Sequence, residues 1–127
     1  MKYLLLINKD EAKWRALPDA ERSEVVARYS AYGRRIIDAG VMRAGERLEH
    51  SDAATTVRVR DGKRLITDGP FAETEEQIAG IIVIDVNNLD EALDWAADHP
   101  DAEWASVEVR PIMPWDQRTA QQGATAP

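Results

Sequence analysis

The sequence contains no cysteine, only two histidines and a single phenylalanine. The lack of cysteine excludes disulfides, thiolate nucleophiles and cysteine-ligated metal sites, and it is compatible with the cytoplasm, where we expect the protein to reside. No stretch is long and apolar enough to span a membrane, and the first residues do not resemble a signal peptide. No His-x-x-x-His, phosphate-loop, Gly-x-Ser-x-Gly or dinucleotide motif occurs. We therefore expect neither a metal nor a bound cofactor.

Positive charge is also scarce. The chain of 127 residues has 16 basic and 23 acidic residues, which gives a net charge of −7. Nucleic acids and anionic membranes bind basic faces, so neither is expected as a partner. The length suits one domain. We place that domain at residues 1–115 and expect residues 116–127, rich in Gln, Thr and Ala, to form a flexible tail.

What the sequence does contain is an alternation of strand and helix patterns. Apolar periodicity predicts strands at Lys2–Asn8, Val41–Glu49, Thr55–Arg60, Lys63–Thr67, Gly80–Val86 and Trp104–Pro111. It predicts a helix at Ala20–Ala39 capped by Asp19, a helix at Leu89–Asp98 capped by Asn88, and a helical turn at Asp10–Arg15. This order indicates an α+β fold with a ferredoxin-like βαββαβ sheet and an extra hairpin.

Two of these strands, Lys2–Asn8 and Gly80–Val86, are apolar on both faces. Two helices can cover only one face of such a sheet. The other face would leave a large apolar patch in water, which is rare in monomers. We therefore expect a homodimer in which two copies join through these sheet faces.

The densest local motif is Asp68-Gly69-Pro70-Phe71, followed by Ala72-Glu73-Thr74. Asp68 can open a turn, Gly69 tolerates a positive φ, and Pro70 fixes φ near −65°. An aromatic side chain held by a rigid turn usually fills an apolar space, so we expect Phe71 to be buried and Asp68 to accept a backbone hydrogen bond. Either this stretch is a stiff connection that pins Phe71 into the core, or it forms the rim of a pocket.

These residues resemble the motif of the DGPF proteins, which belong to the YCII-related family. The similarity extends to the opening Met1–Ile7, to Leu89–Ala92 and to Val107–Pro111, and it covers nearly the whole chain up to Trp115. The resemblance implies a dimeric α+β barrel of ferredoxin-like halves in bacteria, without a settled activity. The genomic association of DGPF proteins with sigma-factor systems would fit an accessory or regulatory role.

The resemblance also has a gap. The family is linked to a His–Asp pair whose histidine lies on the first long helix, but this helix has no histidine and carries Tyr29, Ser30 and Tyr32 in that region. The histidines present are His50 in a loop and His99 at a helix C-terminus, where the helix dipole favours a cationic ring. Acid–base chemistry of the family's kind therefore lacks its histidine here.

Asp85 and Arg58 are the remaining candidates for chemistry. Burial at the end of an apolar strand would raise the pKa of Asp85 and make it a usable acid or base, whereas a place at the solvent edge would make it ordinary. Arg58 belongs to a basic hairpin with Arg60, Lys63 and Arg64. These charges can protect a strand edge, or Arg58 can pair with a motif carboxylate or an acidic ligand.

We expect the ligand-binding residues to line one cavity between the sheet and the motif, and these residues are Asp68, Gly69, Pro70, Phe71, Glu73, Arg58 and Asp85. Two functions remain open at this point. The protein is either a small-molecule-binding or accessory protein, or a cofactor-independent enzyme of the isomerase, cyclase or monooxygenase type. In the enzyme, Asp68, Glu73, Asp85 or a tyrosine of the long helix would transfer protons.

Overall fold

The computed structural model describes residues 1–115, so the predicted tail at 116–127 lies outside the described residues. The strands are β1 (Lys2–Asp10), β2 (Met42–Arg47), β3 (Thr55–Arg60), β4 (Lys63–Asp68), β5 (Glu76–Asp85) and β6 (Ser106–Pro111). The helices are α1 (Glu11–Ala16), α2 (Asp19–Asp38), α3 (Leu89–Asp98) and α4 (Asp101–Trp104), with a 3-10 turn η1 (Ser51–Ala53). The order confirms the predicted α+β, ferredoxin-like arrangement with an inserted hairpin. None of the helices in this part of the chain is long and apolar enough to cross a membrane.

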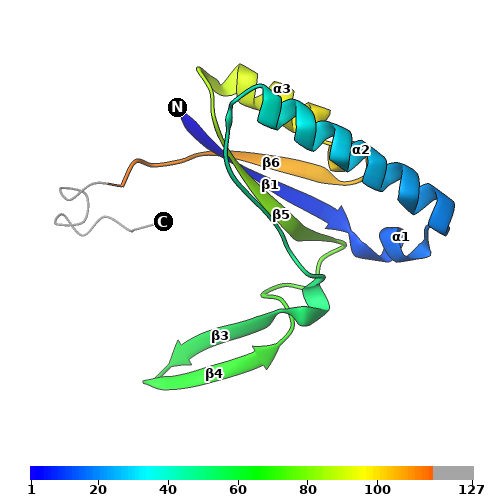
Figure 1. Cartoon of the computed structure of the whole chain (residues 1–127). Helices are drawn as coiled ribbons and strands as arrows, with labels where there is room; N and C mark the ends of the chain where they lie inside the picture. The colour runs from blue at the N-terminus through cyan, green and yellow to red at the C-terminus, as the bar shows by residue number, and fades with distance from the viewer. Residues whose placement is uncertain (116–127) are drawn as a thin grey trace.

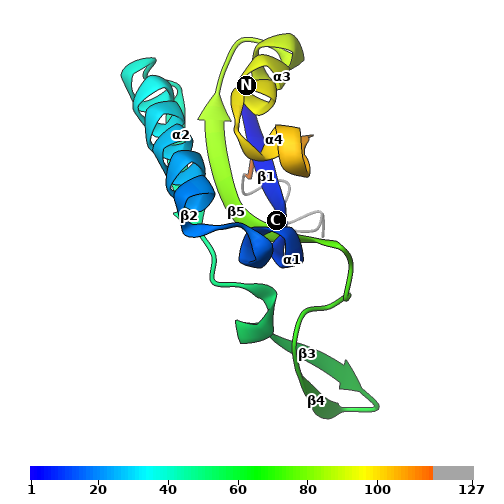
Figure 2. The same cartoon turned by 90° about the vertical axis from the view of Figure 1, so that its right-hand side faces the viewer.

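Four strands form one antiparallel sheet in the order β2-β5-β1-β6 (Figure 1). The central strand β1 pairs with β5 from Lys2 opposite Asp85 to Asp10 opposite Glu76, and with β6 on its other side. Helices α2 and α3 lie across one face of this sheet (Figures 1 and 2). The first residues of β5, which follow the motif, therefore lie beside the end of β1, where α1 begins.

The hydrophobic core lies between that face and the two helices. Alternation along β1 buries Tyr3, Leu5 and Ile7, as the period of two in the sequence predicts. The other buried members are Tyr32, Ile36, Ile84, Val86, Ala92 and Ala96. Complete burial of an aliphatic side chain such as Leu5 stabilises the fold by about 1.5–3 kcal/mol.

The alternate residues of β1 and β5 point to the other face of the sheet, which we call the open face. Its apolar residues are Leu4, Leu6, Ile81 and Val83, and all four are only partly buried. The register places Leu4 opposite Val83 and Leu6 opposite Ile81, so they form one contiguous patch. The described helices lie on the other side of the sheet (Figure 2). That this patch joins two copies of the chain stays a prediction.

Strands β3 and β4 form a separate two-stranded sheet that projects away from the helices (Figures 1 and 2). Asp61 and Gly62 have φ angles of 52° and 74°, as in the tight hairpin turn that the Asp-Gly sequence predicts. At the base of the hairpin, the Gly69 N–H donates to the Ala54 carbonyl at 2.7 Å and the Thr56 hydroxyl donates to the Gly69 carbonyl at 2.9 Å.

Two of the four described helices, α1 and α3, begin with the expected capping chemistry. The Asp10 side chain accepts from the Lys13 N–H at 3.0 Å, and Asn88 accepts from the Glu91 N–H at 2.9 Å. The expectation that Asp19 caps α2 is wrong. Asp19 is the first helical residue, and the cap position before it is held by Pro18, which makes no side-chain hydrogen bond.

The expectation that Phe71 is buried is also wrong, because its side chain is 83% exposed. Gly69, with a φ of 102°, and Pro70 do produce a sharp bend, but the bend carries the ring away from the core. Within residues 1–115, no hydrogen bond reaches the Asp68 carboxylate, so the predicted backbone contact is absent there too. The bend is held instead through the backbone of Gly69.

Candidate functional site

Four polar side chains meet at the end of β1 beneath α2, and we call them the central cluster: Lys9, Tyr29, His99 and Asp101. Each comes from a different part of the fold. Lys9 lies near the end of β1, Tyr29 on α2, His99 at the end of α3, and Asp101 opens α4. The cluster therefore exists only when the sheet and these helices are packed together.

Asp101 is the centre of this cluster. Asp101 is only 4% exposed, and its Oδ1 accepts a hydrogen bond from the Tyr29 hydroxyl. Burial and the Asp101 carboxylate both raise the pKa of Tyr29 far above its ordinary value, so Tyr29 acts as a hydrogen-bond donor. In the part of the chain that the structure describes, Oδ2 of Asp101 makes no hydrogen bond, and no buried side-chain oxygen lacks a partner. Oδ2 is therefore not fully buried.

His99 supports Asp101 through the backbone. The Asp101 N–H donates to His99 Nδ1 at 3.0 Å, which requires that nitrogen to be unprotonated. Burial lowers the pKa of His99, and its ring packs against Tyr29 and Tyr32 with centroid distances of 5.8 Å and 4.9 Å. The expected account of His99 as a cation held by the helix dipole is therefore wrong. The ring is neutral because charge is costly in this aromatic surrounding.

Lys9 supplies the positive charge of the cluster. Its Nζ lies 4.3 Å from the Trp14 ring centroid and 5.1 Å from that of Tyr29, within the range of cation–π attraction. Burial lowers the pKa of Lys9, and the nearby Asp101 carboxylate opposes this shift. A half-buried ammonium beside a buried carboxylate is a common arrangement where a ligand is bound or a proton is moved.

The cluster borders a cavity between β1, α1, α2 and α4, which we call the first hollow. Its volume is about 490 Å³. Trp14, Leu17, Val25 and Trp104 supply apolar walls, and the polar groups Lys9, Tyr29 and Asp101 line the same space. The lining also includes the charged residues Asp10, Lys13, Glu21 and Glu24. Such a combination of apolar walls with a few convergent polar groups is typical of small-molecule sites.

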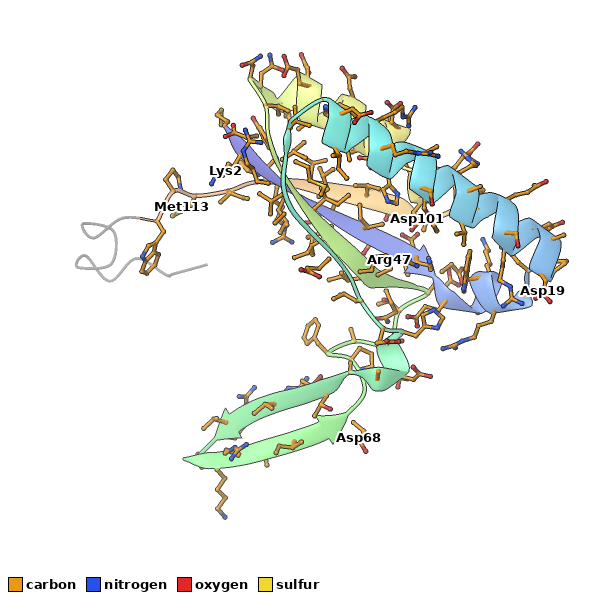
Figure 3. All side chains as sticks on the ribbon, viewed as in Figure 1. Lys2, Asp19, Arg47, Asp68, Asp101 and Met113 are labelled. Carbon is orange, nitrogen blue, oxygen red and sulfur yellow. The ribbon has the colours of Figure 1, made fainter. Side chains whose placement is uncertain are left out.

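A second hollow, of about 310 Å³, lies on the other side of the cluster between α2 and the strands β2 and β5. Lys9, Tyr29 and Asp101 line this hollow as well, and His99 and Arg47 join them. Figure 3 shows Asp101 and Arg47 at the sheet. The positive charge of Arg47 opposes the rise in the pKa of Tyr29, which is consistent with its place beside the cluster.

No group of three or more His, Cys, Asp or Glu residues within 1–115 is arranged to hold a metal ion. The chemistry available at the cluster is therefore that of a carboxylate, an ammonium group, a phenol and a neutral imidazole. These groups can bind an organic ligand, orient it and accept or donate a proton.

The structure divides the predicted motif site into two places. Asp68, Gly69, Pro70 and Glu73 line a shallow depression against α1, and Phe71 lines a neighbouring one with Ile78. Figure 3 shows Asp68 at the end of the hairpin strand β4, away from Asp101 and Arg47. These motif residues do lie near one another, and their role in ligand binding stays a prediction.

Asp85 does not join them. It lies at the opposite end of β5 from Glu76, roughly 30 Å away at about 3.3 Å per residue. The N-terminal ammonium of Met1 donates to Asp85 at 3.1 Å, and this contact lowers the pKa of that carboxyl, with Arg43 and Lys2 acting in the same direction. Of the two alternatives for Asp85, the structure favours the solvent edge over a buried acid with a raised pKa. The expectation of one cavity joining Asp68 and Asp85 is wrong for the single chain.

Arg58 lies on β3 and makes no ion pair within the described part of the chain, so the expected pairing with a motif carboxylate is absent there. Sequence reasoning missed Lys9 and Asp101 and gave Tyr29 only a general role. Lysine and aspartate are common in this chain, and neither lies in a recognisable motif. The one sequence feature that could have pointed to Asp101 is His99-Pro100, which ends α3 and is followed directly by the short helix α4 that begins at Asp101.

Comparison with known proteins supports the fold and places the chain. The YCII-related domain family matches residues 1–116. An uncharacterized protein of Rhizobium meliloti (strain 1021) is 40% identical over 114 residues, which cover 88% of this chain and 92% of that protein. The structure of a 5-chloro-2-hydroxyhydroquinone dehydrochlorinase from Burkholderia phenoliruptrix AC1100, in complex with 2,5-dihydroxybenzoquinone, has a TM-score of 0.52 at 12% identity. The alignment covers 89% of this chain and 94% of that one. At this identity the likeness concerns the fold alone, whereas the sequence matches over nearly the whole chain show that it belongs to the YCII-related family.

Proposed function

We propose that this protein binds a small organic molecule in the first hollow, with Lys9, Tyr29 and Asp101 as its polar contacts. The observation that supports this function is the convergence of three polar groups from three elements on one apolar-walled cavity. Its volume of about 490 Å³ lies within the range of roughly 300–1,000 Å³ that is usual for ligand sites. The Tyr29–Asp101 hydrogen bond is already made, and Lys9 Nζ lies 5.1 Å from the Tyr29 ring centroid, so two of the three groups hold each other in place without a ligand.

The charges of the hollow restrict the ligand. The ammonium of Lys9 can bind an anionic or carbonyl oxygen, and Oδ2 of Asp101 can accept a hydrogen bond from a hydroxyl or N–H group. The walls formed by Trp14 and Trp104 favour a flat apolar body. A small aromatic or conjugated molecule with adjacent hydroxyl and carbonyl or carboxylate groups meets all three requirements.

The second candidate is an enzyme that transfers a proton on such a ligand. The specific observation in its favour is that Tyr29 occupies only Oδ1 of Asp101, which leaves Oδ2 to accept a proton. The nearby Lys9 ammonium would stabilise the enolate or phenolate that results. In this reaction the carbon–hydrogen or oxygen–hydrogen bond of the ligand breaks, its proton moves to Asp101, and the electron pair stays on the ligand.

The structural relative offers limited support for this second candidate. It is named as a dehydrochlorinase, and its ligand is a dihydroxybenzoquinone. A fold of this kind can therefore hold a ring with adjacent oxygen functions. Because the identity is 12%, the relative indicates a ligand class to test and does not assign a reaction to this chain.

A calorimetric titration with hydroxybenzoates and hydroxyquinones tests the site. We expect a ligand that binds the unmodified protein and Asp85→Asn equally, since Asp85 lies at the far end of β5. Binding to Asp101→Asn and to Lys9→Met should be at least tenfold weaker. Equal affinity in all four proteins would show that the ligand lies elsewhere. Loss of binding in Asp68→Asn alone would favour the motif depression instead.

We further propose that the protein functions as a homodimer joined through the open face. The support is the contiguous apolar patch of Leu4, Leu6, Ile81 and Val83, which a single chain leaves partly exposed.

A further inference from the structure

The β3–β4 hairpin has two chemically different faces. Strand pairing places Val57 opposite Ile66, and alternation puts Val59 on the same face. The side chains of these residues are exposed, Val57 at 55%, Val59 at 57% and Ile66 at 59%. The opposite face carries Arg58, paired with Leu65, and Arg60, paired with Lys63. Arg64, opposite Val59, lies on the same face as Val57, Val59 and Ile66. The hairpin therefore exposes one mainly apolar face to water; we call Val57, Val59 and Ile66 the hairpin apolar face.

Within residues 1–115, this hairpin has no other strand on either side and forms a sheet of its own. It stands apart from the main sheet and the helices in both views (Figures 1 and 2). Isolated two-stranded hairpins are marginal in water, and they gain stability when an apolar face is covered. The tight turn at Asp61 and Gly62 nevertheless holds the two strands in register, so the arm is preformed. A preformed arm with an exposed apolar face is suited to docking on another surface.

We propose that the hairpin apolar face docks on the body of a second copy of this chain. This inference goes beyond the ligand site. It proposes a contact of the β3–β4 hairpin with the second copy in addition to the contact between the open faces. It is independent of what binds in the first hollow.

Charge favours a second copy as the occupant. The segment Thr55–Asp68 carries four basic and two acidic residues, which is a net charge of +2. Because the whole chain has a net charge of −7, the rest of the chain has a net charge of −9. The basic arm and the acidic body are thus complementary between copies, and attraction of this kind steers association. Exchange of arms between two copies would make the same contact twice, as a two-fold dimer requires.

Sedimentation velocity over a range of protein concentrations tests the proposal. The decisive variant is Ile66→Glu, which puts a charge on the hairpin apolar face. Its matched control is Leu65→Glu, since Leu65 is the neighbouring residue, is 47% exposed and lies on the opposite face. We expect Ile66→Glu to raise the dissociation constant of the dimer at least tenfold and Leu65→Glu to leave it within about twofold.

A milder variant covers the case in which Ile66→Glu unfolds the hairpin. The double change Val57→Thr and Ile66→Thr keeps strand-forming residues and still weakens the apolar contact. It should weaken the dimer in the same direction, and hydrogen exchange of the hairpin amides in the unmodified protein should slow as concentration rises. A monomeric unmodified protein, or equal dimerisation of Ile66→Glu and Leu65→Glu, would overturn the proposal. Binding of the hairpin to added nucleic acid without self-association would overturn it as well.

Discussion

The hydroxyl of Tyr29 donates a hydrogen bond to the carboxylate of Asp101, although the two residues lie 72 positions apart in the chain. This contact joins the middle of α2 to the first residue of α4 and fixes one oxygen of a buried carboxylate. Asp101 and Lys9 both line the first hollow. One hydrogen bond therefore both holds the helices in place and sets the orientation of the proposed binding group.

Replacement of Tyr29 by Phe should destabilise the protein by about 1–3 kcal/mol, the usual cost of leaving a buried polar group without its partner. The matched control is Tyr32→Phe, which removes a hydroxyl that donates to the neutral Trp95 carbonyl at 2.7 Å. Its cost should be smaller, at about 1 kcal/mol, because bonds to charged acceptors are stronger. Urea unfolding measures both values. A larger loss for Tyr32→Phe than for Tyr29→Phe would contradict the central role given to Asp101.

The pH dependence of stability should contain a contribution from His99. Burial lowers its pKa from the ordinary value of 6.5 in the folded protein. The unfolded chain then binds more protons than the folded one as the pH falls through 6.5, so the free energy of unfolding decreases in that window. Above pH 7 the contribution is flat. Asp101 attracts a proton to the ring and Lys9 repels it, but burial is the largest cause.

Unfolding measured at pH 7 and pH 5 in the unmodified protein and in His99→Gln checks this contribution. We expect the loss of stability between the two pH values to be smaller in His99→Gln, because that side chain does not titrate. His50→Gln is the control, since His50 lies in a loop outside the cluster. An identical pH dependence in all three proteins would show that His99 does not resist protonation.

The open-face dimer can be tested with a pair of identical changes. Val83→Glu places a charge in the apolar patch of the open face and should dissociate the dimer or unfold it, because an unpaired charge would be buried between the copies. Val26→Glu makes the same change on α2, where Val26 is 44% exposed on the helical side. Light scattering should show a dimer for Val26→Glu and for the unmodified protein. A stable monomer in the unmodified protein at micromolar concentration would refute the dimer.

Replacement of Phe71 by Ala should have little effect on the stability of the folded chain. Its exposed position predicts a change of about 0.5 kcal/mol or less, against roughly 3–5 kcal/mol for an aromatic residue in a core. Chemical unfolding at two protein concentrations is the measurement. A loss of several kcal/mol that grows with concentration would mean that the ring is buried against another copy.

Much of the fold could be predicted from the sequence because its signals are local. The alternation of Tyr3, Leu5 and Ile7 with Leu4 and Leu6 identifies a strand with two apolar faces. The Asp-Gly turn identifies the hairpin, and the capping residues identify two helix starts. Boundaries were less accurate where an element lacks a clear pattern. β5 begins at Glu76 because charged residues continue its pairing with β1, and the short helix α4 has no apolar periodicity to reveal it.

The candidate site was predicted less well. The motif suggested that Phe71 fills the core, but a rigid bend fixes only the direction of the backbone and not what lies in front of the ring. Asp85 follows the motif along one strand, yet a strand of ten residues carries it to the other end of the sheet. The prediction that Asp85 lies near the motif failed because an extended strand gives the largest distance per residue of any backbone conformation.

The sequence by itself determined the class of fold, the two faces of the central strands and the exclusion of cysteine chemistry, since composition and periodicity need no distant partner. Only the tertiary structure decided that Lys9, Tyr29 and Asp101 form a site. Their meeting depends on how α2 and α4 pack on β1, and the burial that perturbs Lys9 and Tyr29 exists only after that packing. Side chains of ordinary type acquire unusual properties there because the folded protein removes water from around them.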